Sequence, residues 1–190
     1  MNPTSAPNGE WRERSAESAE RVSDYEYAAI CQFLYTEAEA LDNRDYEAWV
    51  ELVSDDFTYL VPTPRTPDNP FSPHWDERAL LIDESKWSLK AQWFRRFDKD
   101  VYEMAWGDNP PVRFRHMITN VRVRWLTVPS SLEVKSNVLL SGTRQSDLPK
   151  FLTAERTDTL RWIHGRLQLV RRWVVLDQVL IDFPQLRIIL

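Results

Sequence analysis

Four side chains in this 190-residue sequence could together do acid–base chemistry, and His116 is the central one. Imidazole exchanges protons near neutral pH and is the side chain most often used as a general acid or base. Asp42, Tyr59 and Asn120 could supply a carboxylate, a phenol and an orienting amide if the fold placed them beside it. Such a set fits proton abstraction from a small apolar substrate in a dehydratase or isomerase, and equally a pocket that only binds a ligand. Because His116 stands alone in the sequence, a hydrogen-bonded structural histidine is the simpler interpretation.

Side chains that bind metals are scarce. A Rieske [2Fe–2S] centre needs two cysteines and two histidines, and the chain has one cysteine, Cys31. A mononuclear iron site needs two histidines and a carboxylate on one face. His74, His116 and His164 fall on a predicted loop, strand and turn, so no two share an element. We therefore expect neither a metal nor another cofactor on this chain.

Charge and hydropathy argue against two classes of partner. The formal net charge of −5 gives no reason to expect nucleic acid. No apolar run is long enough to cross a bilayer, and the N-terminus lacks the apolar core of a signal peptide. The lone Cys31 forms no disulfide within the chain, so we expect a cytoplasmic protein.

The first half of the chain is predicted to be mainly helical. Residues 1–22 are polar and are expected to form a mobile tail, which leaves residues 23–190 as one domain. Ser23 and Glu26 make a capping-box pattern before a helix whose apolar face runs from Tyr27 to Leu41. A second helix follows the break at 42–45, ends at 54–56 and leads into a strand at 57–61. Prolines make 63–75 a loop, and a third helix is expected from 83 to about 97.

The second half is predicted to be β-structure. Strands are expected at residues 112–126, 132–144, 151–163 and 166–176, with a last short strand at 179–183. Helices followed by a run of antiparallel strands indicate an α+β domain with the helices on one face of a sheet. The apolar residues Leu186, Ile188, Ile189 and Leu190 are expected to be buried.

One hairpin can be predicted residue by residue. His164-Gly165 suits a two-residue loop, which would place Ile163 opposite Arg166. The same register continued along the strands would place Asp158 opposite Arg171, so we expect an ion pair between them.

Three blocks of the sequence resemble the small (β) subunit of bacterial aromatic-ring-hydroxylating dioxygenases of the naphthalene or biphenyl type. They are FLYTEAEALDNRDYEAWVELVSDDFTYLVP (33–62), WGDNPPVRFRHMITNVRV (106–123), and SNVLLSGTRQ (136–145) with ERTDTLRWIHGRLQLVRRWVVLDQVLI (155–181). The resemblance implies an NTF2-like fold, in which a strongly curved antiparallel sheet wraps around the N-terminal helices.

The resemblance also implies a function. It implies an α3β3 complex that converts aromatic hydrocarbons to cis-dihydrodiols, with the Rieske cluster and the mononuclear iron on the α subunit. NADH would supply electrons through a separate reductase and a ferredoxin that contacts the complex. This chain would form the trimeric base and carry no catalytic residue. The alternative uses the same fold as a small dehydratase, isomerase or binding module, with His116, Asp42 and Tyr59 in its pocket.

Overall fold

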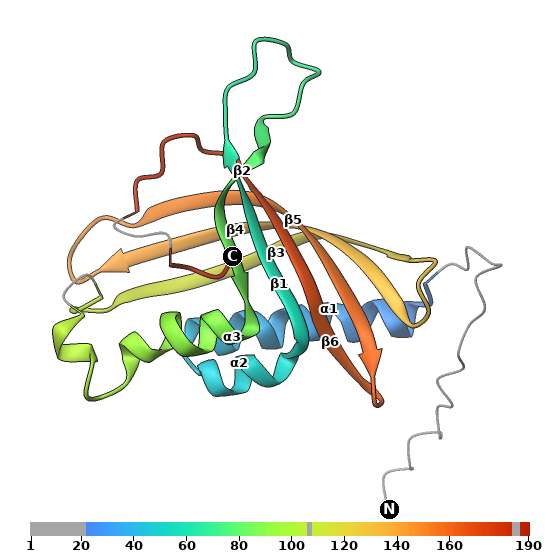
Figure 1. Ribbon diagram of the computed structural model, residues 1–190, viewed down its shortest axis with the longest axis horizontal. Coiled ribbons are helices and arrows are strands. Elements are labelled where there is room, and N and C mark those ends of the chain that lie inside the picture. Colours follow the sequence, from blue (N-terminus) through green and yellow to red (C-terminus); the bar gives the residue numbers. More distant parts are fainter. Residues whose placement is uncertain (1–21, 106–107, 184–186) are drawn as a thin grey trace, which may run out of the picture.

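A six-stranded sheet curls around two helices in the computed structural model, which describes residues 22–105, 108–183 and 187–190 (Figure 1). The strands are β1 (Val53–Pro64), β2 (Trp75–Ser85), β3 (Val112–Trp125), β4 (Ser131–Arg144), β5 (Lys150–Ile163) and β6 (Arg166–Leu176). Their order in the sheet is β2-β1-β6-β5-β4-β3. The expected α+β class and curved sheet are confirmed. The sheet is mixed, since β1 and β6 pair in parallel while the other neighbours are antiparallel.

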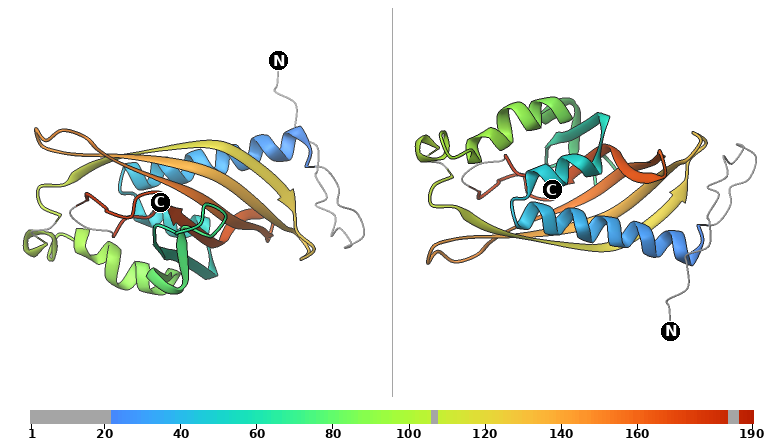
Figure 2. Two further views of the ribbon diagram at one scale, coloured as in Figure 1. Left: turned by 90° about the horizontal axis from the view of Figure 1, so that it is seen from above. Right: turned by 90° about the horizontal axis from the view of Figure 1, so that it is seen from below.

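The long helix α1 (Asp24–Asp42) begins where the capping box predicts. Ser23 Oγ accepts the Glu26 N–H at 3.2 Å, and the Glu26 carboxylate accepts the Ser23 N–H at 2.8 Å. Ile30, Leu34 and Leu41 recur at helical spacing and are buried. Figure 2 shows the result, with α1 lying along the sheet, where it contacts β3.

A short second helix, α2 (Tyr46–Leu52), leads directly into β1. Asp45 caps it by accepting the Ala48 N–H at 3.0 Å, and the fully buried Trp49 packs edge-on against Phe57. The helix ends earlier than the predicted 54–56. The reason is that Val53 pairs with β6, so these residues form the start of a strand.

The structure contains an edge strand, β2, that the sequence pattern does not predict. It pairs with β1, and register shifts flank Pro62, which has no N–H to donate to the ladder. The predicted third helix therefore starts at Lys86 rather than at residue 83, with Ser85 as its N-cap. The helix consists of α3 (Lys86–Ser88), the π-helical turn η1 (Leu89–Trp93) and the 3₁₀ turn η2 (Phe94–Phe97). Its predicted end near residue 97 is therefore confirmed. A further 3₁₀ turn, η3 (Tyr102–Met104), follows.

The hairpin between β5 and β6 confirms the predicted loop. Ile163 pairs with Arg166, and both loop residues have positive φ, 49° at His164 and 75° at Gly165. Such angles at both positions suit the right-handed twist of the flanking strands.

The predicted strand at 179–183 is wrong, because residues 178–183 are irregular. The Asp177 N–H bonds to Thr153 O at 3.1 Å, and the Gln178 side chain then accepts the Thr153 N–H at 3.2 Å. This side chain occupies the position that the next backbone acceptor of a strand would take. Val179 and Leu180 are exposed beyond it.

The described residues share one apolar core, with α1 and α2 against the inner face of the sheet. No helix among them is long and apolar enough to cross a membrane. The expected tail at 1–22 lies outside the described residues except for Val22, which packs against the core.

Candidate functional site

Four charged side chains are buried together between α1 and the sheet. They are Glu37 from α1, Arg156 and Asp158 from β5, and Arg172 from β6, each at most 1% exposed. We call them the buried tetrad. Arg172 binds both carboxylates through two nitrogens each. Its Nε and Nη2 each lie 2.9 Å from an oxygen of Asp158. Its Nη1 lies 2.5 Å from one oxygen of Glu37, and its Nη2 lies 2.9 Å from the other. Two positive and two negative charges balance, as buried ions require.

At Glu37, the attraction of two arginines lowers the pKa of the carboxyl more than burial raises it. Burial alone would raise the pKa of this carboxyl, but Arg172 and Arg156 hold the pKa at about 2, below its usual 4.5. The Trp49 indole N–H adds a hydrogen bond to Glu37 at 3.1 Å. Burial would lower the pKa of the Arg172 guanidinium, but the two carboxylates raise it. Glu37 and Arg172 are therefore both charged at neutral pH.

Arg156 is held less completely than Arg172. Its Nη2 lies 3.0 Å from Asp158 and 3.5 Å from Glu37, while its buried Nε has no hydrogen-bond partner. Burial and the neighbouring Arg172 both lower the pKa of this guanidinium. The tetrad thus has one well-bonded arginine and one weakly bonded arginine.

The predicted ion pair between Asp158 and Arg171 is wrong by one residue. The register holds from the turn to Leu160, which pairs with Leu169, and then shifts. Beyond the shift Asp158 pairs with Arg172, while Arg171 pairs with Thr159. One extra residue in β6 moves each later side chain to the other face of the sheet. Arg171 is accordingly exposed.

The His116 ring links Asp42 of α1 to the backbone of Ile189. Its Nδ1 lies 2.7 Å from Asp42 Oδ1, and its Nε2 donates to Ile189 O at 2.9 Å. Asp42 also accepts the His116 backbone N–H at 3.1 Å, and Arg115 Nη1 lies 3.4 Å from its other oxygen. The His116 side chain is only 3% exposed. An open depression of about 430 Å³ lies outside this pair, between Tyr35 and Arg115.

Tyr59 belongs to the same region through residues 187–190, which we call the strap. The Tyr59 hydroxyl donates to Ile188 O at 3.0 Å and accepts the Leu190 N–H at 3.2 Å. Burial raises the pKa of Tyr59 to about 12, so the phenol stays protonated. The predicted burial of Ile188, Ile189 and Leu190 is confirmed, and Leu186 lies outside the described residues.

Asn120 does not join this set. It is exposed, with φ of 54°, where the pairing of β3 with β4 shifts. The structure thus brings His116 and Asp42 together, links Tyr59 to them through the strap, and leaves Asn120 on the surface.

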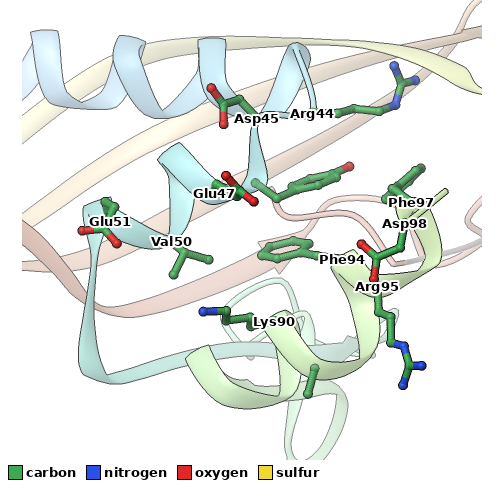
Figure 3. Close-up of a pocket in the computed structure, with 12 residues that line it drawn as sticks. Arg44, Asp45, Glu47, Val50, Glu51, Lys90, Phe94, Arg95, Phe97 and Asp98 are labelled. Carbon is green, nitrogen blue, oxygen red and sulfur yellow. The ribbon is translucent and has the colours of Figure 1, made fainter. Parts of the chain in front are cut away.

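A larger cleft of about 860 Å³ lies between α2 and the helical turns η1 and η2 (Figure 3). Its floor contains the stacked rings of Tyr46 and Phe94, with centroids 4.3 Å apart. Burial raises the pKa of Tyr46 to about 12. Glu47 and Glu51 of α2 line one wall, and Lys90, Arg95 and Asp98 lie on the opposite wall. The lining residues include neither His nor Cys, and the cleft offers apolar rings and a charged rim.

Comparisons with known proteins place the chain in a family. A family model described as "Ring hydroxylating beta subunit" matches residues 36–182. This chain is a ring-hydroxylating dioxygenase β subunit. It is 30% identical over 179 residues to the 3-phenylpropionate/cinnamic acid dioxygenase subunit beta of Photorhabdus laumondii, covering 89% of this chain and 94% of the relative.

Solved structures support the fold of this β subunit. A naphthalene 1,2-dioxygenase with indole bound in its active site matches with a TM-score of 0.70 and 23% identity, covering 89% of this chain and 95% of that one. The β subunit of benzoate 1,2-dioxygenase from Burkholderia mallei matches with a TM-score of 0.59 and 19% identity, covering 87% and 98%. The predicted resemblance to this family is confirmed.

The described part of the β subunit contains no group of three His, Cys, Asp or Glu side chains placed to hold a metal. His74 lies just before β2 and His164 in the hairpin turn, as predicted, so neither shares an element with His116.

Sequence reasoning missed the buried tetrad, although a signal was present. Arg156 and Asp158 share the inward parity of Ala154 and Leu160 in β5. Glu37 likewise lies on the apolar face of α1. Charges on buried positions of two separate elements indicate a compensating cluster.

Proposed function

We propose that this chain is the structural β subunit of an α3β3 ring-hydroxylating dioxygenase and carries no catalytic residue. The α subunit holds the Rieske cluster and the mononuclear iron, and it converts an aromatic ring to a cis-dihydrodiol. NADH supplies the electrons through a reductase and a ferredoxin that contacts the complex. The β chains form a trimer beneath the α subunits.

The observation that carries this proposal is the filled interior. The tetrad occupies the space between α1 and the sheet, and the strap closes the region beside His116, where about 30 Å³ remains. That space suits one water molecule, whereas small-molecule sites measure about 300–1,000 Å³. Both ring nitrogens of His116 are engaged with protein atoms. The dehydratase, isomerase or binding-module alternative needs a pocket inside the curve of the sheet, and that space is filled in this structure. The depression of about 430 Å³ outside His116 and Asp42 is an open surface feature and not such an enclosed pocket. The filled interior therefore favours the structural subunit.

The substrate is set by the α subunit. We propose an aromatic hydrocarbon, of the naphthalene or biphenyl kind. Similar proteins are named both for a hydrocarbon, naphthalene, and for acids, 3-phenylpropionate and benzoate. A β subunit that does not contact the substrate is compatible with either class.

Purification of this chain alone and with its α subunit tests the proposal. The isolated chain should contain no stoichiometric iron and show no oxygenase activity, while the joint preparation should have the mass of an α3β3 complex and contain the iron. Stoichiometric iron or turnover in the isolated chain would contradict the proposal, as would failure of the two chains to associate. Metal analysis, mass measurement and turnover per complex separate these outcomes.

A further inference from the structure

The strap is bound through its backbone by side chains from three separate elements. Three consecutive carbonyls each accept one hydrogen bond. The bonds run from Arg96 Nη2 to Arg187 O at 2.6 Å, from Tyr59 Oη to Ile188 O at 3.0 Å, and from His116 Nε2 to Ile189 O at 2.9 Å. The donors come from η2, β1 and β3, so the fold converges them on one short segment in the way that a protein converges groups on a ligand.

The strap side chains fill an apolar space. Ile188, Ile189 and Leu190 are 6%, 4% and 2% exposed. The remaining gap of about 30 Å³ is walled by aromatic rings, among them Trp93 and Phe114. Without the strap, this region would be a cavity with ring-lined walls and polar groups that donate hydrogen bonds.

These donors are held in place by groups outside the strap. His116 is fixed by Asp42, which accepts its backbone N–H at 3.1 Å and lies 2.7 Å from its ring Nδ1. Tyr59 projects from β1, which is paired on both sides, and its ring packs edge-on against Trp93. Arg96 Nε lies 3.3 Å from Asp108. The donors therefore need little rearrangement to meet another acceptor when the strap leaves.

We propose that the strap masks a ligand site, and that the uncovered site binds a small aromatic molecule bearing a carbonyl group. The rings around the gap select a flat apolar body. Tyr59 and His116 select an acceptor, because an unpaired buried donor is unfavourable. A hydrocarbon of the same shape binds less tightly, since it leaves both donors without partners. The inference does not depend on the proposed function, because it concerns this chain alone.

A matched pair of probes tests the proposal. 2-Acetylnaphthalene and 2-ethylnaphthalene have nearly the same shape, and only the first carries an acceptor. Their affinities would be measured by tryptophan fluorescence on the full chain and on a variant that ends before Arg187. The shortened chain should bind the ketone at least about tenfold more tightly than the full chain does, and at least about tenfold more tightly than it binds the hydrocarbon.

Two further variants make the result decisive. Tyr59→Phe in the shortened chain should reduce the preference for the ketone while leaving hydrocarbon binding unchanged. Full-length Ile188→Gly/Ile189→Gly loosens the strap without removing it, and should show the same preference to a smaller degree. A folded shortened chain that binds neither probe, or both equally, would overturn the proposal. Failure of both strap variants to fold would also overturn it, because the strap would then be part of the core and not a displaceable cover.

Discussion

Replacement of Arg172 by Met should be the most damaging single change to an arginine of the buried tetrad. The methionine roughly keeps the apolar volume but leaves Glu37 and Asp158 with only Arg156 between them, where every side chain is at most 1% exposed. Removing one partner of a buried ion pair costs about 3–5 kcal/mol. Typical domains are stable by about 5–15 kcal/mol, so Arg172→Met should remove a large part of the free energy of unfolding.

Two neighbouring arginines provide matched controls. Arg156→Met removes a guanidinium with one good hydrogen bond and an unpartnered Nε, so a smaller loss of about 1–3 kcal/mol is expected. Arg171→Met changes an exposed side chain on the other face of β6, and should stay within about 0.5 kcal/mol of the unchanged protein.

Urea unfolding of the three variants measures these differences as shifts in midpoint at constant slope. The expected order of damage is Arg172, then Arg156, then Arg171. A loss at Arg171 equal to that at Arg172 would show that the register shift in β6 is misplaced. Losses below about 0.5 kcal/mol at all three positions would show that the charges are not buried.

Three more outcomes follow from single residues. The pKa of Glu37 in the folded protein is about 2, below its usual 4.5, so the charged carboxylate stabilises the fold fully above about pH 4.5 and this stabilisation is lost as the pH falls toward 2. The contribution to the free energy of unfolding is about 3 kcal/mol. Urea unfolding of Glu37→Gln at several pH values should therefore show a flatter stability–pH curve over this range. His116→Ala should lower the free energy of unfolding by about 1–3 kcal/mol and leave turnover per assembled complex unchanged. His74→Ala, at an exposed histidine, is the control. A drop of orders of magnitude in turnover with assembly intact would favour a catalytic role. Gly165→Ala should lower the free energy of unfolding by about 1 kcal/mol in thermal unfolding. The loss comes from the positive φ of Gly165 alone, because an added Cβ meets nothing within 4 Å. An unchanged stability would contradict that backbone angle.

Local signals in the sequence predict most of the fold. The capping box at Ser23, the helical spacing from Ile30 to Leu41 and the His164-Gly165 turn each involve residues close in the chain, and each was confirmed. The family resemblance added the curvature of the sheet, which no local pattern specifies.

The errors involve partners distant in sequence or small changes of register. Edge strand β2 depends on its pairing with β1, which no pattern within residues 75–85 specifies. The single extra residue in β6 is invisible to a period-2 pattern, because Arg171 and Arg172 are chemically equivalent candidates for Asp158. At the candidate site, the polar partners of His116 were predicted in part, through Asp42. The carbonyl of Ile189 could not be, since any backbone could have supplied it.

The parallel pairing of β1 with β6 has a consequence for folding during synthesis. Ser54 Oγ bonds to Leu169 O, 115 positions further along the chain. Until β6 has left the ribosome, β1 has only the edge strand β2 beside it, and its other side presents unpaired backbone groups. Contacts of such long sequence separation form slowly, because the loop between them must close first. The nascent chain should therefore complete its sheet only after β6 has been synthesised, and chains that stop before β6 should be prone to aggregate.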